Sequence, residues 1–217
     1  VPAVSFADYI TEKLKPAVDA GVAAIHLEEP EFWDRAGYSV AFKREYLLHY
    51  KSDYVPPYKS LDAAYRAARL KYYLYRRTID RVFTALKEYA AVRYNRLIRF
   101  YVPTHSLINY SQWKIVSPEG SLIDLPCVDG FIAQVWTGTS RSPNMYMGVK
   151  KERTFETAYL EYGVMQALVE HSGRRMWFLH DPIEDLPAYG WVQRQQLFIE
   201  HPAVGHAPGA QGGELGG

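Results

Sequence analysis

Carboxylate side chains follow two segments of the sequence that read as buried strands. Glu28 and Glu29 stand in the stretch AIHLEEPEFW at 24–33, and Asp181 stands in WFLHDPIED at 177–185. Cleavage of a glycosidic bond needs such a pair, because one carboxyl must protonate the leaving oxygen while the other attacks the sugar or activates water. We therefore expect Glu29 to act as the proton donor and Asp181 as the nucleophile or base. Glu184 is the alternative to Asp181.

These acids also have ordinary structural interpretations. Glu29 follows a strand at a point where a helix could begin, and Asp181 precedes a proline, which is a common way to open a turn. The sequence leaves both interpretations open beside the catalytic one.

Aromatic and hydrogen-bonding side chains stand near the same predicted strand ends. Trp33 and Trp136 are candidates for stacking on the apolar face of a sugar ring, while His105 and Gln134 could hydrogen-bond its hydroxyl groups. Glu28 and Glu184 would complete this substrate-binding set. His105 fits a turn histidine bonded to the backbone equally well. The expected partner is a carbohydrate substrate, and neither a cofactor nor a metal ion is assigned a role.

Four strands are predicted to position these residues, at 22–29, 96–103, 128–136 and 174–182. Helices are predicted at 5–20, 40–51, 60–91, 151–171 and 191–201. This alternation predicts a parallel sheet with helical crossovers. No glycine-rich phosphate-binding motif follows any strand, which disfavours the nucleotide-binding doubly wound folds. The expected fold class is α/β, a (β/α) TIM-type barrel with parallel strands, long crossover helices and its working groups at the carboxyl ends of the strands.

The number of strands limits how much of a barrel the chain can form. A complete eight-stranded barrel takes about 250 residues, and four strands are recognised in this sequence. Residues 1–200 are therefore expected to form a barrel or the C-terminal part of one, followed by a flexible low-complexity tail at 201–217. A half barrel would expose the edges of its sheet, so a homo-oligomer or a missing barrel half is an expected partner.

The longest expected helix, at 60–91, contains neither glycine nor proline. Its apolar residues recur at spacings of four and three, which predicts one continuous buried face. That predicted face consists of Leu61, Tyr65, Ala68, Tyr72, Tyr75, Ile79, Val82, Leu86 and Tyr89. Packing on a sheet is favoured over a coiled-coil seam. The basic residues of the helix predict a solvated face rather than a nucleic-acid site: Arg66, Arg69, Lys71, Arg76, Arg77, Arg81 and Lys87.

The sequence resembles the barrel-fold glycoside hydrolases of the large clan that carries its acid/base on strand four and its nucleophile on strand seven. The stretches that carry the resemblance are HLEEPEFW at 26–33, YVPTHSLINY at 101–110, GFIAQVWTGT at 130–139 and WFLHDPIED at 177–185. If the four strands correspond to strands four to seven, the resemblance implies that the chain holds the second half of the barrel.

The resemblance also implies roles for individual residues. The strand-four motif of the clan is Asn-Glu-Pro, and Glu28-Glu29-Pro30 matches its second and third positions. This match implies that Glu29 is the acid/base, with Glu28 in place of the Asn that contacts the sugar. The clan nucleophile is a Glu, whereas Asp181 stands at the corresponding strand end here.

Two other classes of function are compatible with the sequence. A metal-dependent barrel enzyme could use His26, Glu28, His105, His180 and Asp181 as ligands, although no His-x-His or His-Glu-x-x-His spacing occurs. A barrel fragment that binds carbohydrate or protein without catalysis is the other alternative. A serine hydrolase is disfavoured because the sequence has no Gly-x-Ser-x-Gly motif.

Composition excludes several further classes. The chain has 217 residues and a formal net charge of +1, which gives no electrostatic case for nucleic acid or an anionic membrane. No apolar run approaches the roughly 20 residues of a membrane-spanning helix, and the first residues, VPAVSFADY, do not resemble a signal peptide. The single Cys127 excludes an intrachain disulfide and a cysteine-built zinc site. The cellular location is not predicted.

Overall fold

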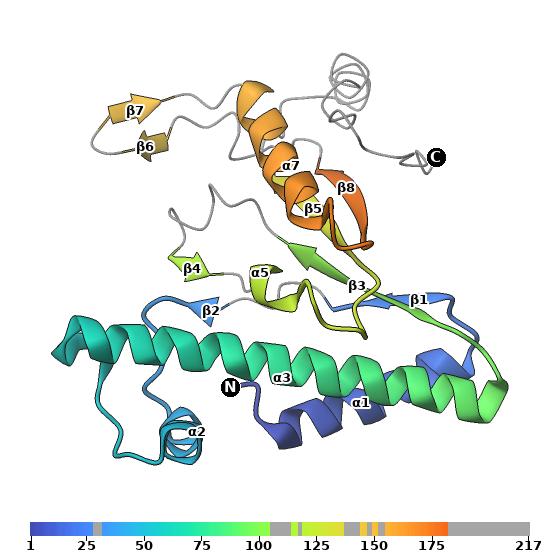
Figure 1. Ribbon diagram of the computed structural model, residues 1–217, viewed down its shortest axis with the longest axis horizontal. Helices are drawn as coiled ribbons and strands as arrows, with labels where there is room; N and C mark the ends of the chain where they lie inside the picture. The colour runs from blue at the N-terminus through green and yellow to red at the C-terminus, as the bar shows by residue number, and fades with distance from the viewer. Residues whose placement is uncertain are drawn as a thin grey trace, which may run out of the picture. The chain divides into compact units, whose positions relative to one another are not determined.

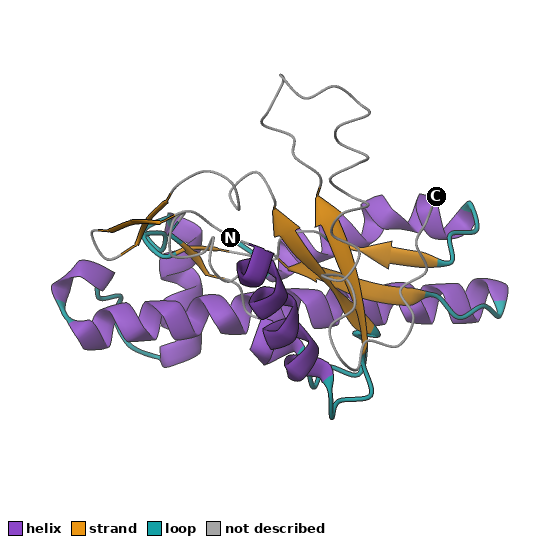
Figure 2. Cartoon of the chain, turned by 90° about the horizontal axis from the view of Figure 1, so that it is seen from above, coloured by secondary structure: helices purple, strands orange, loops and turns teal. Residues whose placement is uncertain are grey.

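A computed structural model of the chain describes residues 1–27, 32–104, 114–116, 119–136, 144–146, 149–151 and 155–181. Helices and strands are mixed along the chain (Figure 2). Four strands form a parallel sheet in the order β1-β3-β5-β8. Their bounds are Ala24–His26 for β1, Arg99–Thr104 for β3, Gly130–Trp136 for β5 and Arg175–Asp181 for β8. These are the four strands predicted from the sequence, and the α/β class is confirmed.

The chain divides into two compact units. The first consists of residues 1–101 and 114–129, and the second of residues 102–113 and 130–217. The predicted helix at 191–201 and the predicted tail at 201–217 both lie outside the described residues.

The first unit is built on one long helix, α3, at Leu61–Tyr94 (Figure 1). The helix begins at Ser60, whose hydroxyl accepts a hydrogen bond from the backbone N–H of Ala63 at 3.1 Å, and Asp62 adds a negative charge to the first turn. It ends at Asn95, which adopts the left-handed conformation that Asn tolerates better than most residues. The caps place the start of the helix one residue after, and its end three residues after, the bounds predicted from the sequence.

The predicted buried face of α3 is wrong in its first half. Leu61 is 91% exposed and Tyr65 is 64% exposed. Ile79, Val82 and Leu86 of the second half are buried as predicted. The other buried residues of the helix are Ala63, Ala67, Leu70, Lys71, Leu74, Thr78, Phe83 and Ala90. The prediction of a fully solvated basic face is therefore also wrong, because Lys71 belongs to the buried set.

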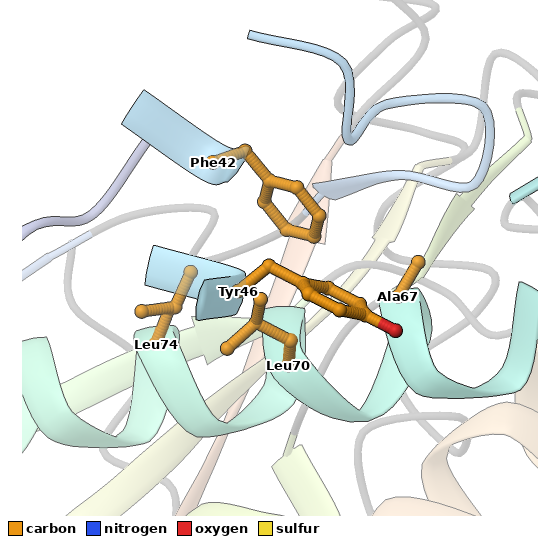
Figure 3. Packing of buried hydrophobic residues seen from close by; sticks show 5 residues of the cluster. All are labelled: Phe42, Tyr46, Ala67, Leu70 and Leu74. Carbon is orange, nitrogen blue, oxygen red and sulfur yellow. The ribbon is translucent and has the colours of Figure 1, made fainter. Parts of the chain in front are cut away.

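Two further helices pack on α3. Helix α1, at Val4–Asp19, lies along it (Figure 1). Helix α2, at Val40–Tyr50, is capped by the Ser39 hydroxyl and places Phe42 and Tyr46 against three side chains of α3, as Figure 3 shows. Those three are Ala67, Leu70 and Leu74. The contact with α2 thus determines which face of the first half of α3 is buried.

Strands β1 and β3 pair in parallel within the first unit, with Ile25 opposite Phe100 and His26 opposite Tyr101. The Phe100 ring packs against Phe83 of α3, with ring centroids 4.4 Å apart, so the long helix covers a strand as predicted. The Asp129 carboxylate accepts a hydrogen bond from the Phe100 N–H at 2.7 Å and forms an ion pair with Lys87 at 2.8 Å. The Asp129 carboxylate thus holds the backbone of β3 at Phe100.

The second unit pairs β5 with β8 in parallel over seven positions, from Gly130 opposite Arg175 to Trp136 opposite Asp181. A Cβ at position 130 would lie 2.4 Å from the carbonyl oxygen of Arg175, so only glycine permits this approach. Helix α7, at Phe155–Val169, packs on the two strands through Tyr162, whose hydroxyl donates to the carbonyl of Leu179 at 3.1 Å.

The remaining elements are short. They are β2 at Phe32–Trp33, the 3-10 helix η1 at Pro57–Lys59, β4 at Ile115–Val116, α5 at Glu119–Leu122, β6 at Asn144–Tyr146 and β7 at Val149–Lys151. β2 pairs with β4 and β6 with β7, both antiparallel. In the described part of the chain, no helix is both long enough and apolar enough to cross a membrane.

Candidate functional site

Half of the predicted catalytic and binding residues lie outside the part of the chain that the structure describes. Glu28, Glu29, His105 and Glu184 fall in undescribed segments. Gln134, Trp136 and Asp181 belong to described strands, but their side chains lie outside the described set. Trp33 is the one predicted site residue whose side chain is described.

The carboxyl ends of β5 and β8 place two predicted residues in register. Trp136 is the last residue of β5 and Asp181 is the last residue of β8, and the two are direct partners across the parallel pair. Adjacent strands lie about 4.8 Å apart, so a carboxylate-bearing residue and an indole-bearing residue end neighbouring strands at one edge. Gln134 pairs with Leu179 two positions earlier.

The carboxyl end of β1 leads directly to the other predicted acids. β1 ends at His26, and the described chain resumes at Phe32, the first residue of β2. Glu28 and Glu29 lie between these two points in the sequence. Parallel pairing of β1 with β3 directs the carboxyl end of β1 the same way as the carboxyl end of β3, which His105 follows.

The Trp33 side chain is exposed and its backbone is fixed. Its relative exposure is 62%, which leaves the indole accessible to a ligand. The residue pairs with Ile115 in the short β2–β4 ladder, and the next N–H, from Asp34, donates to the carbonyl of Lys114 at 2.8 Å. An exposed ring on a fixed backbone is suited to stacking on a sugar.

Lys71 was not among the predicted site residues, although it lies beside Trp33. It is 5% exposed, and its ammonium donates to the backbone carbonyls of Trp33 at 3.1 Å and Asp34 at 2.9 Å. Burial lowers the pKa of Lys71, and the negative charge of Asp34 opposes that shift. The sequence signal was present, because position 71 shares a helical stripe with Ala67, Leu74 and Thr78, all of which are buried.

Phe32 adds an apolar contact beside the Lys71 hydrogen bonds, and the two together are the anchor of β2 on α3. Its ring is buried and meets the rings of Tyr72 at 5.4 Å and Tyr75 at 5.8 Å, while the Lys71 ammonium lies 5.3 Å from its centroid. Both tyrosines are on α3. Backbone hydrogen bonds and ring contacts together hold β2 on the long helix.

Two exposed tyrosines stack on each other, one of them a few residues after β2. Tyr38 and Tyr58 have ring centroids 6.4 Å apart and planes inclined by 18°. The Tyr54 hydroxyl donates to the carbonyl of Gly37 at 2.7 Å, which joins the two segments that carry the stacked rings. Both rings are exposed.

Of the five candidate metal ligands, only His26 has a described side chain. Within the described residues, no group of three or more His, Cys, Asp or Glu side chains is arranged to hold a metal ion. Cys127 is buried, and its Sγ lies 3.5 Å from an oxygen of Asp80. Burial, reinforced by that carboxylate, raises the pKa of the thiol to about 12, so Cys127 is not an activated nucleophile.

Comparison with known proteins gives no family assignment, since no family model, curated protein or solved structure matches the chain.

Proposed function

We propose that the protein is a glycoside hydrolase that cleaves its substrate with Glu29 and Asp181. The observation that carries the proposal is the register of β5 with β8, because Asp181 ends a parallel strand directly beside Trp136. Catalytic residues of (β/α) barrels stand at such carboxyl ends. Glu29 follows the carboxyl end of a third strand of the same sheet by three residues.

The order of strands supports a barrel as the finer description of the fold. In the order β1-β3-β5-β8, each successive strand is added beside the previous one. A doubly wound sheet reverses direction at a switch point, whereas a barrel adds strands in sequence order. A closed eight-stranded barrel would need four further strands, supplied by another part of the protein or by a second copy.

In the proposed reaction, the Glu29 carboxyl donates its proton to the leaving glycosidic oxygen. The Asp181 carboxylate either attacks the anomeric carbon or removes a proton from an attacking water molecule. In the first case water then cleaves the glycosyl–Asp181 ester and the Glu29 carboxylate takes up its proton. Separations of about 5–5.5 Å and 6.5–9.5 Å between the carboxyl groups correspond to retention and inversion respectively.

The binding residues have distinct roles in this proposal. Trp33 and Trp136 stack on the apolar faces of the sugar rings. His105 and Gln134 hydrogen-bond hydroxyl groups, while Glu28 and Glu184 contact the sugar from the segments that follow β1 and β8.

The test compares Glu29→Gln and Asp181→Asn with the wild type on a panel of 4-nitrophenyl glycosides and unactivated oligosaccharides. Glu29→Gln should reduce kcat/KM by about 10²–10⁴-fold on oligosaccharides. It should reduce kcat/KM less on 4-nitrophenyl glycosides, because that leaving group needs little protonation. Asp181→Asn should impair both substrate types equally.

Glu31→Gln is the matched control, since Glu31 lies in the same acidic segment and has no assigned role. Equal activity of Glu29→Gln and the wild type would refute the assignment. A wild type that cleaves no substrate in the panel but binds oligosaccharides through Trp33 would favour the non-catalytic binding alternative, for which the exposed indole is the supporting observation.

A further inference from the structure

We infer that Lys71 is a positioning residue for Trp33, whose backbone it holds. The inference deepens the proposed function and rests on it for the role of Trp33 in substrate binding.

The ammonium of Lys71 contacts the backbone of the segment rather than its side chains. Its hydrogen bonds go to the carbonyl oxygens of two consecutive residues, Trp33 and Asp34. Backbone contacts of this kind fix where the chain runs. The backbone of Trp33 is thereby fixed, while its exposed ring stays accessible.

The charge of Lys71 shows that it does more than fill space. An apolar side chain of similar volume would pack on Phe32 without the cost of removing an ammonium from water. Lysine instead supplies directional donors to two carbonyls and a cation to the Phe32 ring.

The experiment compares Lys71→Met with Lys87→Met by amide hydrogen exchange and by kinetics. Lys87 is on the same helix, but its ammonium pairs with Asp129 and not with β2. Lys71→Met should accelerate exchange of the amides at 32–38 about tenfold or more. Exchange of the amides of α2 and α3 should stay unchanged. Lys87→Met should leave exchange at 32–38 unchanged.

In the kinetic arm, the most reactive 4-nitrophenyl glycoside serves as the probe. Lys71→Met should raise KM several-fold with little change in kcat, since it releases the backbone of Trp33, which binds the substrate in the proposed function and takes no part in the chemical step. If the wild type cleaves no glycoside, the proposed function fails, whereas the exchange measurement still decides the anchoring role of Lys71.

Unchanged exchange at 32–38 in a folded Lys71→Met protein would overturn the inference. An increase spread evenly over α2 and α3 would also overturn it, since that pattern reports general loss of packing. If Lys71→Met does not fold, Lys71→Gln takes its place. Gln keeps a donor on a shorter stem, so exchange at 32–38 should rise by an intermediate amount, and no rise would count against the inference.

Discussion

Lys71 and Arg77 are two cationic side chains of helix α3 that are largely buried, and they differ in their partners. The Arg77 guanidinium forms two hydrogen bonds to the carboxylate of Glu45 on α2, at 2.9 and 3.1 Å. The Lys71 ammonium instead bonds to the backbone carbonyls of Trp33 and Asp34. The first contact joins two helices, and the second joins a helix to the segment that follows β1.

The difference indicates what each contact is suited to do. In the Arg77–Glu45 pair the charges cancel, and the planar fork of Arg matches both carboxylate oxygens. Around Lys71, neutral carbonyls accept the hydrogen bonds, and the negative charge of Asp34 only partly opposes the effect of burial on the pKa of the ammonium. We therefore assign the α2 contact to stability and the β2 contact to holding the backbone at Trp33.

The largest expected effect comes from breaking the ion pair on one side. Glu45→Met should lower the free energy of unfolding by about 3 kcal/mol, because it leaves the Arg77 guanidinium without its carboxylate. The loss should lie toward the lower end of the range for buried pairs, since a quarter of the Arg77 side chain, 25%, remains exposed. Urea denaturation measures it.

The double variant Glu45→Met with Arg77→Met is the control for this prediction. It replaces both charges with apolar groups and should recover most of the lost stability. A double variant as unstable as Glu45→Met alone would contradict the assignment of the loss to an uncompensated charge.

A smaller effect on stability is expected at the other cation. Lys71→Met should cost about 1–2 kcal/mol, because two backbone carbonyls lose their donor, while the variant is relieved of a buried ammonium. The same urea titration measures it. A loss equal to that of Glu45→Met would remove the distinction between the two contacts.

The sequence did not show which face of the first half of α3 is buried. In the first half of α3 two stripes compete, one through Leu61 and Tyr65 and one through Ala63 and Ala67. Large apolar side chains favour the first stripe, but the second is buried because Phe42 and Tyr46 of α2 pack on it. Tyrosine counts as apolar in a pattern, although its hydroxyl lets it remain in water.

Longer-range pairing explains what else the sequence did not reveal. The four strands of the sheet were predicted because each is a short run rich in apolar residues, and Asp181 was correctly expected at the end of its strand. Strands β2 and β4 have two residues each and pair across more than 80 positions, Phe32 with Val116. No local pattern encodes such a ladder, so the contact of Lys71 with the backbone of Trp33 and Asp34 could not be predicted either.

The smallest expected effect is a dependence on pH that belongs to Lys71 and not to Arg77. Burial lowers the pKa of Lys71 in the folded state below the ordinary value of 10.5. Below the lowered pKa both the folded and unfolded states hold the proton, and the stability difference between wild type and Lys71→Met is constant. Between the lowered pKa and 10.5 the unfolded state binds more protons, so the wild type should gain stability relative to Lys71→Met as pH rises.

Urea titrations of the wild type, Lys71→Met and Arg77→Met at increasing alkaline pH measure this difference. The pKa of Tyr50 and of Tyr54 is raised by burial, and both titrate in all three proteins, so they cancel in the comparison. Arg77 stays protonated throughout this range, and the difference between wild type and Arg77→Met should therefore be flat. A wild type that loses stability relative to Lys71→Met as pH rises would mean that the protonated ammonium is favoured in the folded state. Lys71 would then resemble the charge-compensated Arg77, and the contrast between the two contacts would not hold.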